Sequence, residues 1–142
     1  MTDHLATAAT DISASPERVW TVLTDPAQIR LFMFGAEVHT DWRVGSAIVW
    51  RGEYEGRPYE DRGTILAADP GRLLKLTHFS PLSGLPDVPE NYHTLSYELI
   101  GKETETRLSL TQDNNSSEEA AEHARGMWEA HVAGIKKAAE QS

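Results

Sequence analysis

Hydrophobic and polar residues alternate with a period of two over the middle of the chain, from residue 37 to residue 112. Such alternation is typical of strands with one buried face. Trp50 on one run, and Leu95 and Tyr97 on another, mark the apolar face. Turn residues separate the runs, and the connections are too short for crossover helices, which predicts an antiparallel meander. The six strands are expected at residues 37–42, 47–54, 59–68, 73–79, 92–100 and 105–112.

A strand and two short helices are expected before the meander. Residues 6–13 form a Thr- and Ile-containing run that predicts a first strand. The Ser-Pro-Glu segment at residues 15–17 is typical of a helix start, and the helix is expected to end at Thr24. Asp25 then begins a second helix that runs to Phe32.

A long helix is predicted over residues 117–140, where alanine and glutamate dominate. Its apolar residues recur at spacings of four and three, which predicts a stripe facing the sheet. They are Ala124, Trp128, His131, Ile135 and Ala138. The sequence thus predicts an α+β fold in which a seven-stranded antiparallel sheet is covered on its apolar face by this helix.

Composition narrows the class of protein. A chain of 142 residues has the size of one domain, so we expect a single domain over residues 1–142. Its formal net charge of −9 repels phosphate backbones and argues against nucleic-acid binding. The chain has no cysteine, which excludes disulfides, thiolate zinc sites and cysteine nucleophiles. Neither a secretory signal nor a long apolar span is present, so we expect a cytoplasmic protein without membrane insertion.

Several short segments together resemble a known family. They are ISASPERVW at 12–20, DWRVGS at 41–46, GTIL at 63–66, TLSYEL at 94–99, TRLSLT at 106–111 and GMW at 126–128. This pattern is similar to the SRPBCC superfamily, the START-like or birch-pollen-allergen-like helix-grip proteins. Within it, the pattern resembles most the homologues of the activator of the 90-kDa heat-shock-protein ATPase. The resemblance implies a curved sheet wrapped around the C-terminal helix, with an apolar cavity between them.

That cavity is the expected ligand site, because apolar hollows with a few polar groups are the usual binding sites. The expected ligand is a lipid, a steroid or a polyketide-like aromatic. The candidate lining residues are Phe32, Phe34, Trp50, Tyr54, Leu76, His78, His93, Leu95, Tyr97, Leu110, Gln112, Trp128 and His131. For the apolar members the alternative is plain packing in a solid core.

Polar residues on the apolar faces are the more specific signal, since an unsatisfied buried polar group is costly. His78 and His93 flank the proline-rich loop at residues 80–90 and are expected near one mouth of the cavity. They could bind the polar head of a ligand, or they could be satisfied by backbone and water. The acidic pair Glu60 and Asp61 stands beside arginines and is interpreted as solvated sheet surface.

Three functions remain open from the sequence. The first is a binding module for a small hydrophobic molecule, and the second is a chaperone-associated protein-interaction domain. The third is a cyclase- or hydrolase-like enzyme that uses histidine or tyrosine in the cavity. Motifs for nucleotides, metals or a nucleophile are missing, so we assign no cofactor, metal or catalytic residue. A protein partner is possible, and both a monomer and a homodimer fit the sequence.

Overall fold

The structure is a computed structural model that describes residues 4–33 and 35–141, apart from the side chains of Tyr54 and Leu82. The strands are β1 (His4–Ile12), β2 (Glu37–His39), β3 (Ala47–Tyr54), β4 (Arg57–Asp69), β5 (Leu73–His78), β6 (His93–Lys102) and β7 (Glu105–Asn115). The helices are α1 (Pro16–Thr24), α2 (Pro26–Phe32) and α3 (Glu118–Glu140), with short 3₁₀ turns η1 (Pro81–Ser83) and η2 (Pro89–Asn91).

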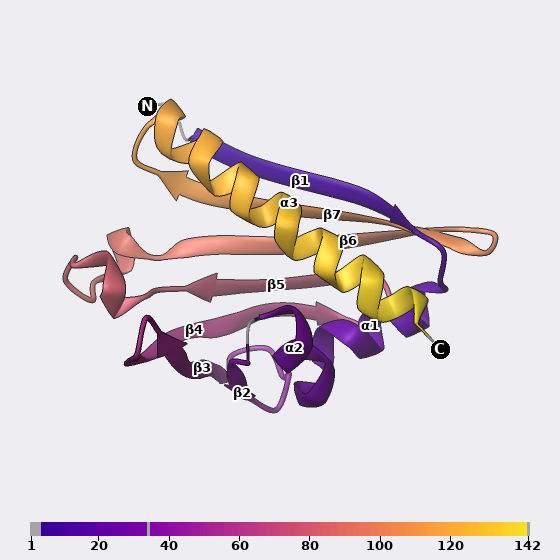
Figure 1. Cartoon of the computed structure of the whole chain (residues 1–142), viewed down its shortest axis with the longest axis horizontal. Coiled ribbons are helices and arrows are strands. Elements are labelled where there is room, and N and C mark those ends of the chain that lie inside the picture. Colours follow the sequence, from indigo (N-terminus) through magenta and orange to yellow (C-terminus); the bar gives the residue numbers. More distant parts are fainter. Residues whose placement is uncertain (1–3, 34, 142) are drawn as a thin grey trace.

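The described strands form one antiparallel sheet in the order β1-β7-β6-β5-β4-β3-β2. Helix α3 crosses one face of the sheet diagonally, while α1 lies beside the C-terminal end of α3 and α2 lies beside β2 (Figure 1). The seven-stranded sheet, the long covering helix and the two short helices confirm the predicted helix-grip fold.

The helix ends follow from local chemistry. The Ser15 hydroxyl accepts a hydrogen bond from the Arg18 N–H at 3.2 Å, and the Ser117 hydroxyl accepts one from Ala120 N–H at 3.0 Å. Such N-caps satisfy backbone donors that the first turn leaves free. The Arg18 guanidinium in turn donates to the carbonyls of Ala138 and Gln141, at 3.1 and 3.0 Å. A cation at a helix C-terminus is favourable, so this contact joins α1 to the end of α3.

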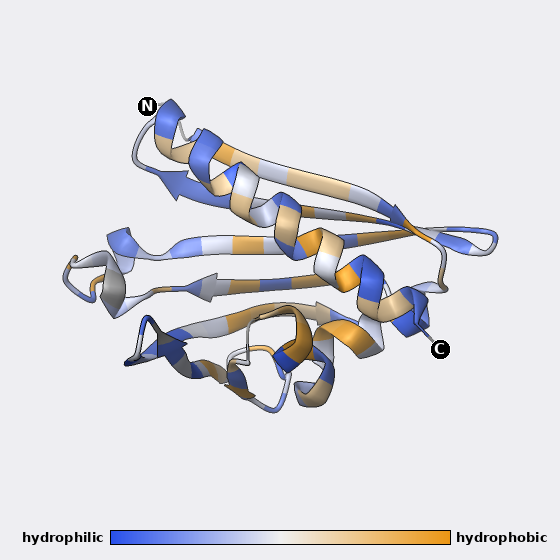
Figure 2. Ribbon diagram, viewed as in Figure 1, coloured by the Kyte–Doolittle hydropathy of each residue, from blue (hydrophilic) through white to orange (hydrophobic). Residues whose placement is uncertain are grey.

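The core lies between the concave face of the sheet and α3. Residues of every second position along the strands are buried there, as the alternating colours of β5 and β6 in Figure 2 indicate. Ile12, Ile65 and Leu108 from the sheet and Ile135 from α3 are fully buried. The buried Thr106 hydroxyl donates to the Ala14 carbonyl at 2.8 Å, so this polar group is satisfied.

The strand boundaries differ from the prediction by three residues in two places and by at most two residues elsewhere. The strand expected over 37–42 ends at His39, because Trp42 adopts a left-handed backbone with φ of 61°. The Asp41 carboxylate accepts a hydrogen bond from the Arg43 N–H at 2.9 Å and holds this turn. The last strand extends to Asn115, three residues further than expected. Neither difference moves the core.

Candidate functional site

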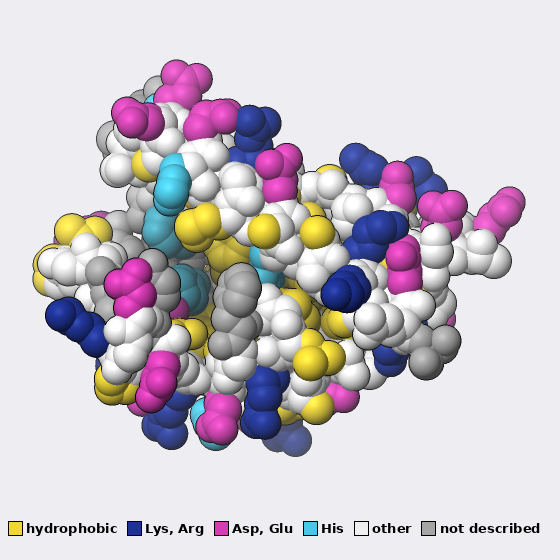
Figure 3. All heavy atoms as spheres, in the orientation of Figure 1, with side chains coloured by type: hydrophobic (Ala, Val, Ile, Leu, Met, Phe, Trp, Pro, Cys, Tyr) yellow, Lys and Arg dark blue, Asp and Glu magenta, His cyan; other side chains and the backbone are white. Residues whose placement is uncertain are grey.

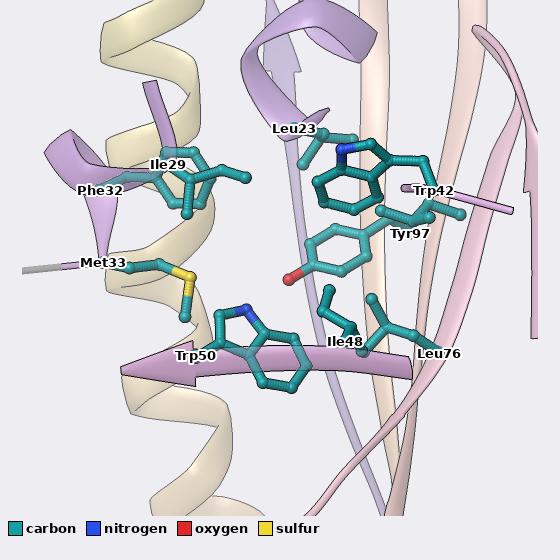
Figure 4. Close-up of a pocket in the computed structure, with 10 residues that line it drawn as sticks. Leu23, Ile29, Phe32, Met33, Trp42, Ile48, Trp50, Leu76 and Tyr97 are labelled. Carbon is teal, nitrogen blue, oxygen red and sulfur yellow. The ribbon is translucent and has the colours of Figure 1, made fainter. Parts of the chain in front are cut away.

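A small cavity lies between α1, α2 and the concave face of the sheet. Its volume is about 20 Å³. The lining residues are Leu23, Ile29, Phe32, Met33, Trp42, Ile48, Trp50, Leu74, Leu76 and Tyr97. In Figure 4 these side chains surround the Tyr97 hydroxyl, which points toward the middle of the group. A water molecule needs about 10 to 15 Å³ by this measure, so the cavity has room for about one water.

The cavity that these described residues line is far smaller than the expected ligand, because large aromatic side chains occupy the interior around it. Four predicted lining residues do line the small cavity: Phe32, Trp50, Leu76 and Tyr97. Leu95 and Leu110 are buried core residues that do not border it. Phe34 and the side chain of Tyr54 lie outside the described residues.

The sequence reasoning missed Trp42 and Met33 as lining residues. Both lie outside the regular elements, in a left-handed turn and at the end of α2, where periodicity carries no information. The positive φ of Trp42 aims its indole at the cavity rather than along a strand (Figure 4). A bulky residue in this conformation costs about 1 to 3 kcal/mol of strain, which the packing of the indole against the core must offset.

Tyr97 and His131 form a buried polar pair that links β6 to α3. The Tyr97 hydroxyl lies 3.0 Å from His131 Nε2. The His131 ring also makes edge-on contacts with Phe32 and Trp128, at centroid distances of 5.1 and 5.2 Å. Burial lowers the pKa of His131 to about 4 and raises the pKa of Tyr97 above its ordinary value. Both groups are thus uncharged near neutral pH.

A row of polar side chains crosses the concave face toward the N-terminal end of α3. It consists of Asp61 on β4, His78 on β5, His93 on β6 and Gln112 on β7, and we call it the polar row. His78 pairs with His93 across β5 and β6, and Gln112 pairs with Leu95 across β6 and β7. His78 Nε2 and Asp61 Oδ2 are 2.9 Å apart, so the imidazole N–H donates to the carboxylate.

Asp61 corrects a prediction, because it is not on the solvated surface of the sheet. It pairs directly with Trp50 across β3 and β4, and only 15% of its side chain is exposed. Neighbouring strand residues point to opposite faces, so Asp61 faces inward while Glu60 and Arg62 face outward. Glu60 does form the expected surface ion pair, with Arg51 at 2.8 Å.

Four buried side-chain atoms have no hydrogen-bond partner among the described residues. They are Asp61 Oδ1, His78 Nδ1, Gln112 Oε1 and Trp128 Nε1. Three of them belong to the polar row, and Trp128 lies on α3 one turn before His131. His93 differs, because its Nδ1 is 2.8 Å from the Asp113 carbonyl and donates to it. The Nδ1 atom of His93 is therefore satisfied by a backbone carbonyl, which was the alternative to ligand binding in the sequence analysis.

The loop between β5 and β6 is fastened beside the polar row. Asp87 accepts a hydrogen bond of 2.6 Å from the Tyr92 hydroxyl and pairs with Arg62 at 3.3 Å. The Tyr92 ring stacks on Phe79, and Asn114 donates to the Glu90 carbonyl at 2.7 Å. The loop thus lies against the end of the sheet where the polar row begins.

A hollow is visible on this side of the molecule. In Figure 3 it lies between α3 and the part formed by α2 and β3, with hydrophobic and histidine side chains in its floor. Among the described residues, no three His, Asp or Glu side chains come together as a metal site would need. No helix in the described part of the chain is long and apolar enough to span a membrane.

A curved antiparallel sheet around a long C-terminal helix, with two short helices after the first strand, defines the helix-grip class of the SRPBCC superfamily. The chain belongs to the family described as "Activator of Hsp90 ATPase homolog 1-like protein", whose model matches residues 13–140. A search of curated proteins gives no match in sequence.

Solved structures agree with this family. ChR145 from Cytophaga hutchinsonii is 44% identical over 94% of this chain and 91% of its own, with a TM-score of 0.83. Protein MLL2253 from Mesorhizobium loti is 19% identical over 98% of both chains, with a TM-score of 0.78. The Aha1 dimer from Colwellia psychrerythraea is 20% identical over 99% of this chain and 98% of its own, with a TM-score of 0.73. The last two show a shared fold.

Proposed function

We propose that this protein binds a small, largely apolar molecule with a polar head in the interior between the sheet and α3. The observation that carries the proposal is the set of four unpartnered buried atoms on the polar row and Trp128. Each buried polar atom without a partner costs about 1 to 3 kcal/mol. A ligand in the interior that supplies the missing hydrogen bonds would explain why these buried atoms are tolerated.

The positions of Trp128 on α3 and of the polar row on the sheet support a single binding site between the helix and the sheet. The Tyr97–His131 contact fixes which part of α3 lies over β6. Trp128 is three residues before His131, a displacement of about 4.5 Å along the helix. Gln112 pairs with Leu95, which lies two residues from Tyr97 on β6. This displacement also runs toward the N-terminal end of α3 (Figure 1). Trp128 and the polar row therefore face the same part of the interior.

The apolar part of the ligand would displace the aromatic side chains that now fill the interior. Helix α3 packs closely against β1, β7, α1 and α2. Its backbone lies further from β3, β4 and β5, and large side chains fill the space between them. Rotation of Trp50, which lines the present cavity, would therefore enlarge it without breaking the contacts that hold α3. Side-chain rearrangements at binding sites are common.

Mapping by NMR tests this function. The protein is titrated with a panel of apolar amines, fatty acids, steroids, flavonoids and polyketide-like aromatics, and amide shifts are followed. We expect at least one compound to shift amides of β4 to β7 and α3 in saturable fashion and to raise the unfolding temperature. Silence of the whole panel, or shifts confined to the outer face of the sheet, would overturn the proposal.

A protein-interaction role is the second candidate, and the small size of the cavity favours it. An interior with room for about one water needs no ligand to be stable. In this case the outer sheet face or the loop of residues 80–90 would contact a chaperone ATPase, in keeping with the family. The test is the ATPase rate of the host's 90-kDa heat-shock protein. Stimulation supports this role, and an unchanged rate rejects it.

A further inference from the structure

The unpartnered atoms of the interior are mostly hydrogen-bond acceptors. Asp61 Oδ1 and Gln112 Oε1 can only accept. His78 Nε2–H donates a hydrogen bond to Asp61 at 2.9 Å, so in the neutral ring Nδ1 is an acceptor as well. Trp128 Nε1 is the one donor of the four. A matching head group therefore has more donors than acceptors.

Charge points the same way. Among the described residues, Asp61 has a hydrogen bond from His78, and no lysine or arginine pairs with it. At the inward positions of β4 to β7 the buried and half-buried residues include no lysine or arginine, and Arg57, at the hairpin end of β4, is exposed. A second anion beside Asp61 would be repelled in this enclosed setting, whereas a cation would be attracted.

Aromatic rings surround the same region. Trp50 is the direct cross-strand neighbour of Asp61, and its indole meets the His78 ring edge-on at a centroid distance of 5.1 Å. Trp128 lies opposite on α3, in contact with His131 at 5.2 Å. The faces of indole rings attract ammonium ions. The overall charge of −9 also favours the approach of cations over anions.

We infer that the ligand is an apolar amine, whose ammonium group binds Asp61 beside His78 and whose apolar body lies among the tryptophans. This inference rests on the proposed function and names its ligand class. It excludes carboxylates, fatty acids among them, as the preferred ligands. A neutral hydroxyl group meets the same acceptors without the charge and is expected to bind with intermediate strength.

The test uses three probes that share one ring system: 2-naphthylmethylamine, 2-naphthol and 2-naphthoate. Dissociation constants are measured by isothermal titration calorimetry at pH 7 with the full-length protein. We expect the amine to bind at least tenfold more tightly than the naphthoate, with naphthol between them. Naphthoate binding equal to or tighter than amine binding would overturn the inference and leave the proposed function standing. Failure of all three to bind would overturn both.

Asp61→Asn and Glu60→Gln form a matched pair of variants. Each removes one negative charge, and the two positions are adjacent on opposite faces of β4. Asp61→Asn is expected to weaken the amine at least tenfold and to leave naphthol within about threefold, while Glu60→Gln changes neither. Equal losses in the two variants would mean that only long-range charge matters, and an unchanged amine affinity in Asp61→Asn would remove the proposed contact. The wild-type probe series stands as evidence should Asp61→Asn fail to fold.

Discussion

Acid should destabilise this protein through protonation of His131. A variant without this histidine separates its effect from those of the other titrating groups. Burial holds the pKa of His131 at about 4 in the folded protein, against 6.5 in the unfolded chain. The unfolded state therefore binds a proton between these values while the folded state does not. The corresponding stability is fully present above pH 6.5 and is lost as the pH falls toward 4.

The size of the loss follows from the two pKa values. Each pH unit in this window is worth about 1.4 kcal/mol for one proton, so on the order of 2 to 3 kcal/mol of stability is lost between pH 7.5 and pH 4.5. Unfolding by urea at several pH values gives the free energy directly. Carboxylates also titrate in this range, so the useful quantity is the difference between the wild type and His131→Gln, which cannot titrate there.

Tyr97→Phe serves as the control. It removes the hydroxyl at 3.0 Å from His131 Nε2 but leaves the ring enclosed by Phe32 and Trp128. Because burial is the cause of the shifted pKa, this variant should keep the pH dependence of the wild type. A difference between the wild type and His131→Gln that stays constant from pH 7.5 to 4.5 would refute the reasoning.

Three further substitutions test the packing and the caps. Gly126→Ala should raise the free energy of unfolding by about 0.8 kcal/mol, because an added Cβ meets no atom within 4 Å and alanine favours helix, so the melting temperature should rise. Gly63→Ala should cost about 4 kcal/mol or abolish folding, because its Cβ would overlap the Thr77 carbonyl oxygen; a stable variant in thermal unfolding would contradict the close approach of β4 and β5. Ser117→Ala should cost about 1 kcal/mol in urea unfolding through loss of the α3 N-cap, and no change would mean that the hydrogen bond to Ala120 N–H contributes nothing.

The fold was predictable because its strongest signals are local. Period-two alternation gave the strands from β3 to β7, and the Ser-Pro and Asp-Pro steps gave the starts of α1 and α2, where Ser15 and Asp25 do cap the helices. The stripe of α3 placed Ile135 in the core, where it is fully buried. Each of these features depends on neighbouring residues and needs no knowledge of the strand register.

The site was less predictable, because it depends on register and on side-chain packing. Asp61 stands in a charged run, and only its pairing with Trp50 reveals that it faces inward. Trp42 reaches the cavity through a left-handed turn that no periodic pattern encodes. The size of the cavity depends on how Trp50 and Tyr97 fill the space that the backbone leaves, which residue types alone do not determine.

The most direct measurement is the free energy of unfolding of Gln112→Leu without ligand, compared with Thr111→Val. Gln112 is only 6% exposed and its Oε1 has no partner among the described residues, whereas Thr111 is the adjacent residue on the opposite face of β7. If Gln112 serves binding at the expense of stability, leucine should stabilise the protein by about 1 to 2 kcal/mol, with the control unchanged. A clear loss of stability in Gln112→Leu would mean that the amide serves the fold, and would contradict a ligand site at the polar row.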